Sequence, residues 1–242
     1  MTVSFAKSIT AWRYRLRSKV WPQNSIVFYT TKTSEEWTPE SLKIGIGGSQ
    51  GDVIYLAREW VRLGYEVTVY NNCGAKEGIY DGVQYLNYKK FNYYASFDTL
   101  VVWRYPWIIN FSIKAKRLWL DLHDVPSHQE FTQERLQGFD KIFVCSEYHK
   151  NRLPAHIPDA KVVIIPNGFD QAYLQWKSEI RDPYKLIYAS RYYRGLELML
   201  SYGWPIIKRE IPNAHLHIYH GLSTPDNQPE RVSISGFSEM TT

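Results

Sequence analysis

The sequence has few cysteines, no long apolar run and only a mild excess of positive charge. Cys73 and Cys145 are the only two cysteines in 242 residues, too few for a disulfide framework or a cysteine-based metal cluster. This composition is typical of a reducing compartment, so we expect a cytoplasmic protein. No apolar run approaches the roughly 20 residues that a membrane-spanning helix needs. The net charge of +5 suits acidic ligands or an anionic membrane surface, but it is too small to indicate nucleic-acid binding.

Two widespread nucleotide-binding motifs are missing as well. A dinucleotide-binding G-x-G-x-x-G pattern would need its third glycine at position 50, where the sequence has Gln50. That pattern also follows directly on a strand, whereas the glycine-rich segment here begins about fourteen residues after the preceding predicted strand. No Gly-Lys-Ser or Gly-Lys-Thr follows the glycines, which excludes a P-loop.

The glycine-rich segment at residues 45–51 is the most informative feature that is present. It has four glycines in seven residues and precedes a predicted helix. Glycine has no Cβ atom, so the backbone amides of such a loop can approach a phosphate or a sugar closely. The free N–H groups at the start of the helix favour an anion. Gly45 and Gly51 are explained equally well as turn residues, whereas Gly47 and Gly48 are the predicted ligand contacts.

Aromatic residues are abundant, at 16% of the chain with 19 tyrosines and 9 tryptophans. Exposed aromatic rings would suit stacking on sugar rings. A large aromatic core explains the same content, and we expect that explanation to hold for most of these residues. The sequence leaves both interpretations open.

Strand and helix signals alternate from Asn24 onward. The helix that follows the glycines has apolar residues at helical spacing between Val53 and Leu63, and it ends at Gly64. Strands separated by helices predict an α/β fold with a Rossmann-like, doubly wound parallel sheet, whose ligands bind at the carboxyl ends of the strands. We therefore expect residues 45–49 and His123 at one edge of the sheet. β-rich or continuous apolar runs predict strands at residues 25–29, 66–70, 82–86, 98–103, 117–122, 141–145 and 162–165.

A second unit begins after the polar segment 175–183. Strands are predicted at residues 184–190 and 215–221, with a helix between them that starts at Gly195. A Rossmann-like domain needs roughly 100–150 residues, so these elements form an incomplete domain or dock onto the first sheet. We expect the region after Asp182 to be the least stable part of the chain and to self-associate.

The segment 12–21 alternates arginine and lysine with aromatic and aliphatic residues. One interpretation is an anchor at the inner membrane face, with cations on lipid phosphates and tryptophan at the headgroup level. The other is a solvated basic leader. We therefore divide the chain into a leader (1–23), an N-terminal Rossmann-like domain (24–172) and a linker with an incomplete C-terminal domain (173–242).

A series of short motifs carries a resemblance to a known family. In this order and spacing they resemble the retaining, two-Rossmann-domain (GT-B) glycosyltransferases of family 4, over the N-terminal domain and the first strand, helix and strand of the second. The motifs are Glu36-Trp37-Thr38-Pro39, the loop 45–49, Leu120-Asp121-Leu122-His123-Asp124, Val144-Cys145-Ser146-Glu147-Tyr148-His149, Ile165-Pro166-Asn167-Gly168-Phe169-Asp170, Tyr188-Ala189-Ser190, Arg194-Gly195-Leu196-Glu197, Pro212-Asn213-Ala214 and His217-Ile218-Tyr219-His220-Gly221.

The resemblance implies a sugar transfer from a nucleotide-sugar to a glycan or lipid-linked acceptor, with retention of configuration. The nucleotide-sugar is a co-substrate, and neither a cofactor nor a metal is implied. His215 and His217 alternate on a strand in a way that would suit a metal, but no third ligand is evident.

The same resemblance assigns roles to residues of the first domain. His123 would lie beside the transferred sugar and position it as the catalytic residue, with Asp124 and Ser49 at the acceptor side. Gly47 and Gly48 would offer backbone amides near the reacting centre and the donor phosphate. A histidine that only satisfies a loop backbone is the alternative for His123.

Two further strand ends are implied to contribute to the acceptor side or to the cleft between the domains. Ser146 and Glu147 follow one strand, although a serine there is often a helix N-cap and Glu147 can lie in the first turn of that helix. Asn167 and Gly168 follow the next strand, and a tight turn explains them as well.

Donor phosphate binding is implied for the second unit. Arg191 and Arg194 would neutralise the diphosphate, and Gly195 would open the helix that follows. A solvated basic loop is the alternative.

One departure from the family pattern concerns the donor side. The family has two glutamates eight positions apart that contact the donor, and no two glutamates of this chain have that spacing; Glu197 belongs to a different motif. The alternative function is therefore a non-catalytic remnant that binds a sugar or a partner, or a fragment completed by another polypeptide.

Overall fold

The computed structural model describes residues 19–110, 113–125, 131–175, 181–190, 192–219 and 232–234. The chain divides into two compact units, Met1–Phe169 and Asp170–Thr242. Each unit has its own sheet, and among the described residues no strand of the second unit pairs with the first sheet. The strands of the second unit therefore form a sheet of their own. Arg191 and residues 12–18 lie outside the described residues.

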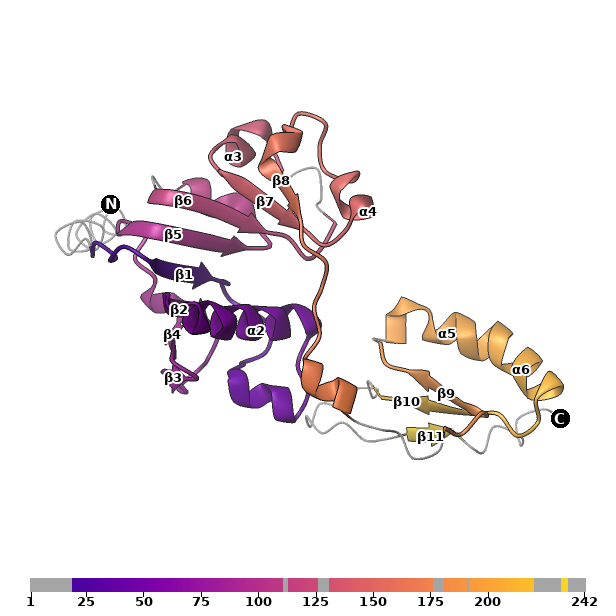
Figure 1. Cartoon of the computed structure of the whole chain (residues 1–242). Helices are drawn as coiled ribbons and strands as arrows, with labels where there is room; N and C mark the ends of the chain where they lie inside the picture. The colour runs from indigo at the N-terminus through magenta and orange to yellow at the C-terminus, as the bar shows by residue number, and fades with distance from the viewer. Residues whose placement is uncertain are drawn as a thin grey trace, which may run out of the picture. The chain divides into compact units, whose positions relative to one another are not determined.

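The first unit contains an eight-stranded sheet in the order β3-β4-β2-β1-β5-β6-β7-β8 (Figure 1). All neighbouring pairs are parallel except β3 and β4. The predicted α/β fold with a mostly parallel, Rossmann-like sheet is thus confirmed. The strands are β1 (Ser25–Tyr29), β2 (Glu66–Asn71), β3 (Gly78–Tyr80), β4 (Val83–Asn87), β5 (Ser96–Trp103), β6 (Lys114–Asp121), β7 (Lys141–Val144) and β8 (Val162–Ile164).

Helices flank this sheet and are mostly short. The longest, α2 (Gly48–Arg62), begins inside the glycine-rich segment, and Gly64 behind it has a φ of +89°, which a glycine adopts without strain. No described helix is long and apolar enough to span a bilayer. The others are α3 (Gln133–Gln137), α4 (Glu147–Lys150) and the 3₁₀ segments Pro39–Lys43, Tyr88–Lys90, Pro106–Asn110 and Asp159–Lys161.

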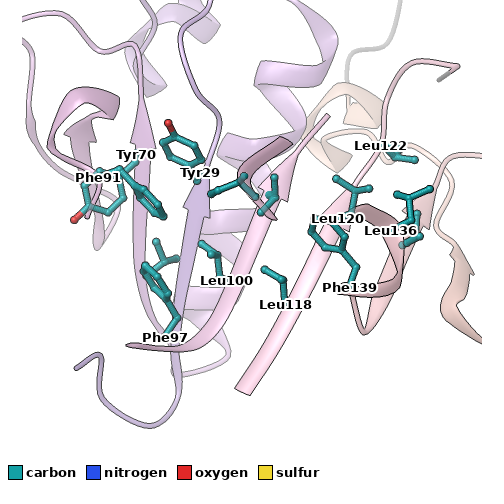
Figure 2. Packing of buried hydrophobic residues seen from close by; sticks show 14 of the residues in the cluster. Tyr29, Tyr70, Phe91, Phe97, Leu100, Leu118, Leu120, Leu122, Leu136 and Phe139 are labelled. Carbon is teal, nitrogen blue, oxygen red and sulfur yellow. The ribbon is translucent and has the colours of Figure 1, made fainter. Parts of the chain in front are cut away.

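The central strands are buried on both faces because their residues are apolar at consecutive positions. In β1, Val27 and Tyr29 pack into one core cluster, while Ile26 and Phe28 pack into the other, which also contains the buried face of α2. Successive side chains of a strand point to opposite faces, so a continuous apolar run fills two cores. Figure 2 shows the first cluster, which combines leucines of the central strands with several aromatic rings.

Many of the aromatic residues belong to this first cluster. The rings of Tyr29 and Phe91 stack with centroids 4.1 Å apart, and Phe91 and Phe97 stack at 5.5 Å. Trp21, which the sequence assigned to the basic leader, is buried and stacks on Phe97 at 6.2 Å. Trp21 is therefore part of the domain core, and the described chain joins the sheet through a bridge between Val20 and Ser96.

The second unit has a three-stranded sheet in the order β11-β10-β9, in which β9 and β10 are parallel. Its small core joins Trp204, Ala214 and Leu216, whereas Ile187 and Tyr202 are exposed by 60% and 71%. The elements are the 3₁₀ segment Gln171–Gln175, β9 (Lys185–Tyr188), the 3₁₀ turn Tyr192–Arg194, α5 (Leu196–Leu198), a π-helical turn (Met199–Gly203), α6 (Trp204–Glu210), β10 (His215–Ile218) and β11 (Val232–Ile234).

Two strands were not predicted, and both have three residues at a sheet edge. β3 contains Gly78, and its central residue Ile79 is 74% exposed. Each pairs with its neighbour in antiparallel register. Such short segments have too few residues for an alternating pattern to be visible.

The buried carboxylate of Asp98 yields a prediction about pH. Lys116 Nζ and Arg117 Nη2 lie 3.2 and 2.6 Å from its oxygens, and the Asn24 amide donates to it at 3.1 Å. Burial alone would raise the pKa of Asp98, but the hydrogen bonds from Lys116, Arg117 and Asn24 outweigh it and hold the pKa below its ordinary value.

We expect Asp98→Asn to lower the free energy of unfolding. This loss should have its full size above about pH 4, the ordinary pKa of aspartate. The difference from the wild type should shrink as the pH falls through the lowered pKa of folded Asp98, because Asp98 is then protonated in both the folded and the unfolded state and, like asparagine, carries no charge. Urea unfolding of both proteins at a series of pH values measures this difference. Asp159→Asn is the control, because the side chain of Asp159 is 83% exposed. A difference that does not change with pH would contradict the prediction.

The small core of the second unit yields a prediction about local stability. We expect the amides of β9 and β10 to exchange with solvent faster than those of β5, because few buried apolar side chains oppose their opening. Hydrogen exchange followed by mass spectrometry measures this within one sample. Equal protection of β9 and β5 would show that the second unit is as stable as the first.

Candidate functional site

The order of strands reverses between β1 and β5. From β1 the chain continues to β2 and β4 on one side, and it returns to β5, β6 and β7 on the other side of β1. The connections on either side of such a point diverge, and ligands of doubly wound sheets bind there, beyond the carboxyl ends of the strands. Four polar or charged residues lie at or just after the carboxyl ends of β5 and β6: Arg104, Asp121, His123 and Asp124.

His123 lies between two carboxylates. Its Nε2 is 3.1 Å from Asp121 Oδ2, and its Nδ1 is 3.6 Å from Asp52 Oδ2. The three side chains are 10%, 14% and 26% exposed for His123, Asp121 and Asp52. Because Asp52 belongs to α2 and Asp121 ends β6, this contact places His123 at the edge where the glycine-rich segment enters the helix.

Arg104 joins the same edge from the end of β5. Its Nη2 donates to the Ser49 hydroxyl at 2.6 Å, and its Nε lies 3.0 Å from Asp124 Oδ2. The guanidinium also lies over the Trp103 ring, 4.2 Å from the centroid. Arg104 has a φ of +67°, which costs free energy for any residue with a Cβ atom. Strain of this kind persists where surrounding contacts hold the residue, as they do here.

Trp103 supplies an aromatic wall to this cluster. It is 2% exposed, and its ring centroid is 6.1 Å from that of His123. Its indole N–H has no hydrogen-bond partner among the described residues.

Burial shapes the electrostatics of the edge. Burial raises the pKa of Asp52, with a further contribution from Asp121, while His123 opposes the shift. Burial and the neighbouring carboxylates also raise the pKa of the Cys145 thiol, so this cysteine is a weak nucleophile. Burial lowers the pKa of His149, whose Nε2 lies 3.0 Å from the Asp124 carbonyl oxygen.

The glycines predicted as ligand contacts lie at the start of α2. Gly47 is the N-cap and Gly48 the first helical residue. A Cβ atom on Gly48 would meet nothing within 4 Å, and one on Gly47 would meet the flexible Gln50 side chain. Packing within the chain therefore does not require glycine at position 48. The amides of Gly48 and Ser49 have no acceptor among the described residues, as expected for a helix start.

The other predicted residues of the first unit are placed as follows. Ser146 is the N-cap of α4, and its hydroxyl accepts from the His149 amide at 3.1 Å. Glu147 is the exposed first residue of that helix. Asn167 and Gly168 lie in an exposed loop after β8. In the part of the chain that the structure describes, none of these four forms a hydrogen bond or ion pair with His123 or Arg104. Of the predicted catalytic and acceptor residues, Ser49 and Asp124 contact Arg104, and His123 lies beside Asp52, which belongs to the same helix as Ser49.

In the second unit, Arg194 ends an exposed 3₁₀ turn and Gly195 follows it. Gly195 has a φ of +104°, a conformation that L-residues rarely adopt. This backbone requirement explains the glycine without a ligand. Arg194 is exposed and therefore accessible to an anion.

Sequence reasoning missed Arg104, Asp52 and Asp121 as site residues. Arg104 and Asp121 end apolar strands, so the rule that pointed to His123 applies to them too. Asp52 lies inside α2, and nothing in the local pattern distinguishes it from a solvated helix residue.

The cluster offers both donors and acceptors of hydrogen bonds. Three carboxylates (Asp52, Asp121 and Asp124) face one guanidinium and one imidazole. Among the described residues, no group of three or more His, Cys, Asp or Glu side chains could hold a metal ion. This arrangement suits a neutral ligand with several hydroxyl groups better than it suits a phosphate, which the carboxylates would repel.

The chain matches no protein-family model, and comparisons with curated proteins and with solved structures found no match either. The functional assignment therefore rests on this site and on the order of the motifs.

The backbone of Arg104 yields a prediction about stability. We expect the free energy of unfolding of Arg104→Gly to be about 0.5–1 kcal/mol higher than that of Arg104→Ala, because glycine adopts a positive φ without strain. Both variants lose the contacts with Ser49 and Asp124, so the comparison isolates the backbone. Chemical denaturation measures both.

The matched control is the same pair of substitutions at Val125, which is 54% exposed and has no positive φ. There glycine should be the less stable of the two, because it loses more backbone entropy on folding. Finding alanine more stable than glycine at both positions would contradict the prediction.

Proposed function

We propose that this chain is a glycosyltransferase of the retaining, metal-independent type, which transfers a sugar from a nucleotide-sugar to a glycan or lipid-linked acceptor. The observation that carries the proposal is the cluster around His123 at the point where the strand order reverses. In it, one imidazole, one guanidinium and three carboxylates surround an edge where α/β sheets bind ligands.

The chemistry of the first unit supports a role in holding sugar hydroxyl groups. Carboxylates accept hydrogen bonds from hydroxyl groups, and the amides of Gly48 and Ser49 donate to them. The Arg104 guanidinium lies over the Trp103 ring beside these groups. His123 would position the transferred sugar, with Ser49 and Asp124 on the acceptor side.

The donor diphosphate would bind to the second unit. The exposed guanidinium of Arg194 can form two parallel hydrogen bonds with a phosphate, and the sequence places Arg191 three positions before it. These cations would stabilise the departing nucleoside diphosphate, whose own oxygen would take the proton of the attacking hydroxyl group. Carboxylates at the first site make Gly47 and Gly48 the weaker candidates for this phosphate contact.

The small core of the second unit favours a second candidate. Ile187, Leu198 and Tyr202 are exposed by 60%, 64% and 71%, which suits a surface that another polypeptide covers. In that case this chain is a sugar- or partner-binding remnant, or a fragment that another chain completes. Self-association would cover the same surface with a second copy of this chain.

The localisation proposed here is cytoplasmic and peripheral to the inner membrane face. Residues 12–18 would supply the lipid contact with their cations, since Trp21 is buried in the core.

A nucleotide-sugar titration tests the donor side. We expect the chain to bind nucleoside-diphosphate sugars with a dissociation constant of about 1 mM, equivalent to roughly −4 kcal/mol, because the glutamate pair of the family is absent. Arg194→Gln should weaken this binding at least about fivefold through the loss of charge-assisted hydrogen bonds. NMR chemical-shift titration across a panel of donors measures both.

Arg209→Gln is the matched control, since Arg209 is an exposed arginine of the same unit with a 71% exposed side chain. It should leave the dissociation constant unchanged. Binding in the micromolar range, or equal losses for both arginine variants, would contradict the proposed donor site. Donor hydrolysis or transfer measured on the same samples separates the enzyme from the non-catalytic alternative.

A further inference from the structure

The two ring nitrogens of His123 have unequal carboxylate partners. Nε2 is within hydrogen-bonding distance of Asp121 Oδ2, at 3.1 Å, whereas Nδ1 is 3.6 Å from Asp52 Oδ2. A neutral imidazole carries one N–H and one lone pair. With the proton on Nε2, the ring donates a charge-assisted hydrogen bond to Asp121. With the proton on Nδ1, the Nε2 lone pair would face a carboxylate oxygen at 3.1 Å, which is repulsive.

We infer that Asp121 holds His123 in the Nε2–H tautomer, so that Nδ1 is a hydrogen-bond acceptor for a ligand hydroxyl group beside Asp52. Asp121 is then a positioning residue, and His123 and Asp52 are the groups that contact the ligand. The identity of the ligand as a sugar rests on the proposed function, whereas the tautomer does not.

The geometry between Nδ1 and Asp52 selects the class of ligand. At 3.6 Å the Nδ1 lone pair and the carboxylate oxygen are two acceptors that do not hydrogen-bond to each other directly. Two neighbouring hydroxyl groups can satisfy both, because one donates to Nδ1 and the other to Asp52. A phosphate brings few donors and additional negative charge, so this pair selects a neutral polyol with adjacent hydroxyl groups.

The surroundings of His123 agree with this assignment. Asp52 faces it from α2 and Asp121 from β6, while the Trp103 ring at the end of β5 packs at a centroid distance of 6.1 Å. His149 of α4 also interacts with it electrostatically, and Arg104 is engaged with Ser49 and Asp124. Burial raises the pKa of Asp52, while His123 opposes the shift.

Long-range ¹H–¹⁵N NMR of the histidine rings in the full chain tests the tautomer. Mildly alkaline buffer keeps ordinary imidazoles neutral, and the signals of His123 are those lost in His123→Gln. We expect a protonated Nε2 and an unprotonated Nδ1. A protonated Nδ1, or an even mixture of the two tautomers, would overturn the inference.

Two isosteric variants identify the residue that sets the tautomer. Asp121→Asn should lower the ratio of Nε2–H to Nδ1–H at least about fivefold, because a neutral acceptor forms a weaker hydrogen bond than a carboxylate. Asp52→Asn should leave Nε2–H dominant. The reverse pattern overturns the role of Asp121, and the wild-type spectrum still decides the tautomer if a variant does not fold.

Titration with neutral monosaccharides, and separately with inorganic phosphate, tests the ligand class on the same sample. We expect monosaccharides with adjacent hydroxyl groups to move the Nδ1 resonance and inorganic phosphate to leave it in place. A response to phosphate alone overturns the ligand class. Because this readout needs neither a donor nor turnover, a failed transfer assay would count against the glycosyltransferase proposal and not against the tautomer.

Discussion

The pairing of β1 with β5 at the centre of the sheet is the constraint on which the site depends. Both strands are buried on both faces, and β1 lies between β2 and β5 in parallel register. The chain must therefore leave β1 toward one side and return to the other, which opens the edge beyond their carboxyl ends. The start of α2, Arg104 and the segment after β6 meet at that edge because of this strand order.

Charged side chains meet at this edge with a residue in a strained backbone conformation. Arg104 adopts a left-handed conformation while its side chain links Ser49 of α2 to Asp124 after β6. The carboxylates of Asp52 and Asp121 lie close to the imidazole of His123. A protein that needed only a stable core would place apolar residues at such half-buried positions, since burying carboxylates is costly. We interpret the arrangement as a binding site whose cost is offset by the aromatic and aliphatic cores on either side of the sheet.

The first unit was predictable from the sequence to a large extent, and the site only in part. Continuous apolar runs identified seven of its strands, whereas β3 was too short to show a pattern. Ser49, His123 and Asp124 were expected at one edge and lie there, but Arg104, Asp52 and Asp121 were missed. The rule for strand ends identifies candidates one strand at a time, and it does not say which ends are neighbours. Trp21 was assigned to a leader because its local context is basic, although its ring packs on Phe97.

By itself, the sequence determined the α/β class, the parallel sheet and the helix that starts at the glycines. Those features follow from local periodicity, because a strand or helix buries the face on which its apolar residues recur. Only the tertiary structure decided that Asp52 and Asp121 flank His123, that Arg104 links Ser49 to Asp124, and that the strands after residue 184 form a sheet of their own. The spatial order of strands depends on contacts between distant segments, which no local pattern encodes. The positive φ of Arg104 has the same origin, since contacts with two distant segments, at Ser49 and Asp124, hold its side chain.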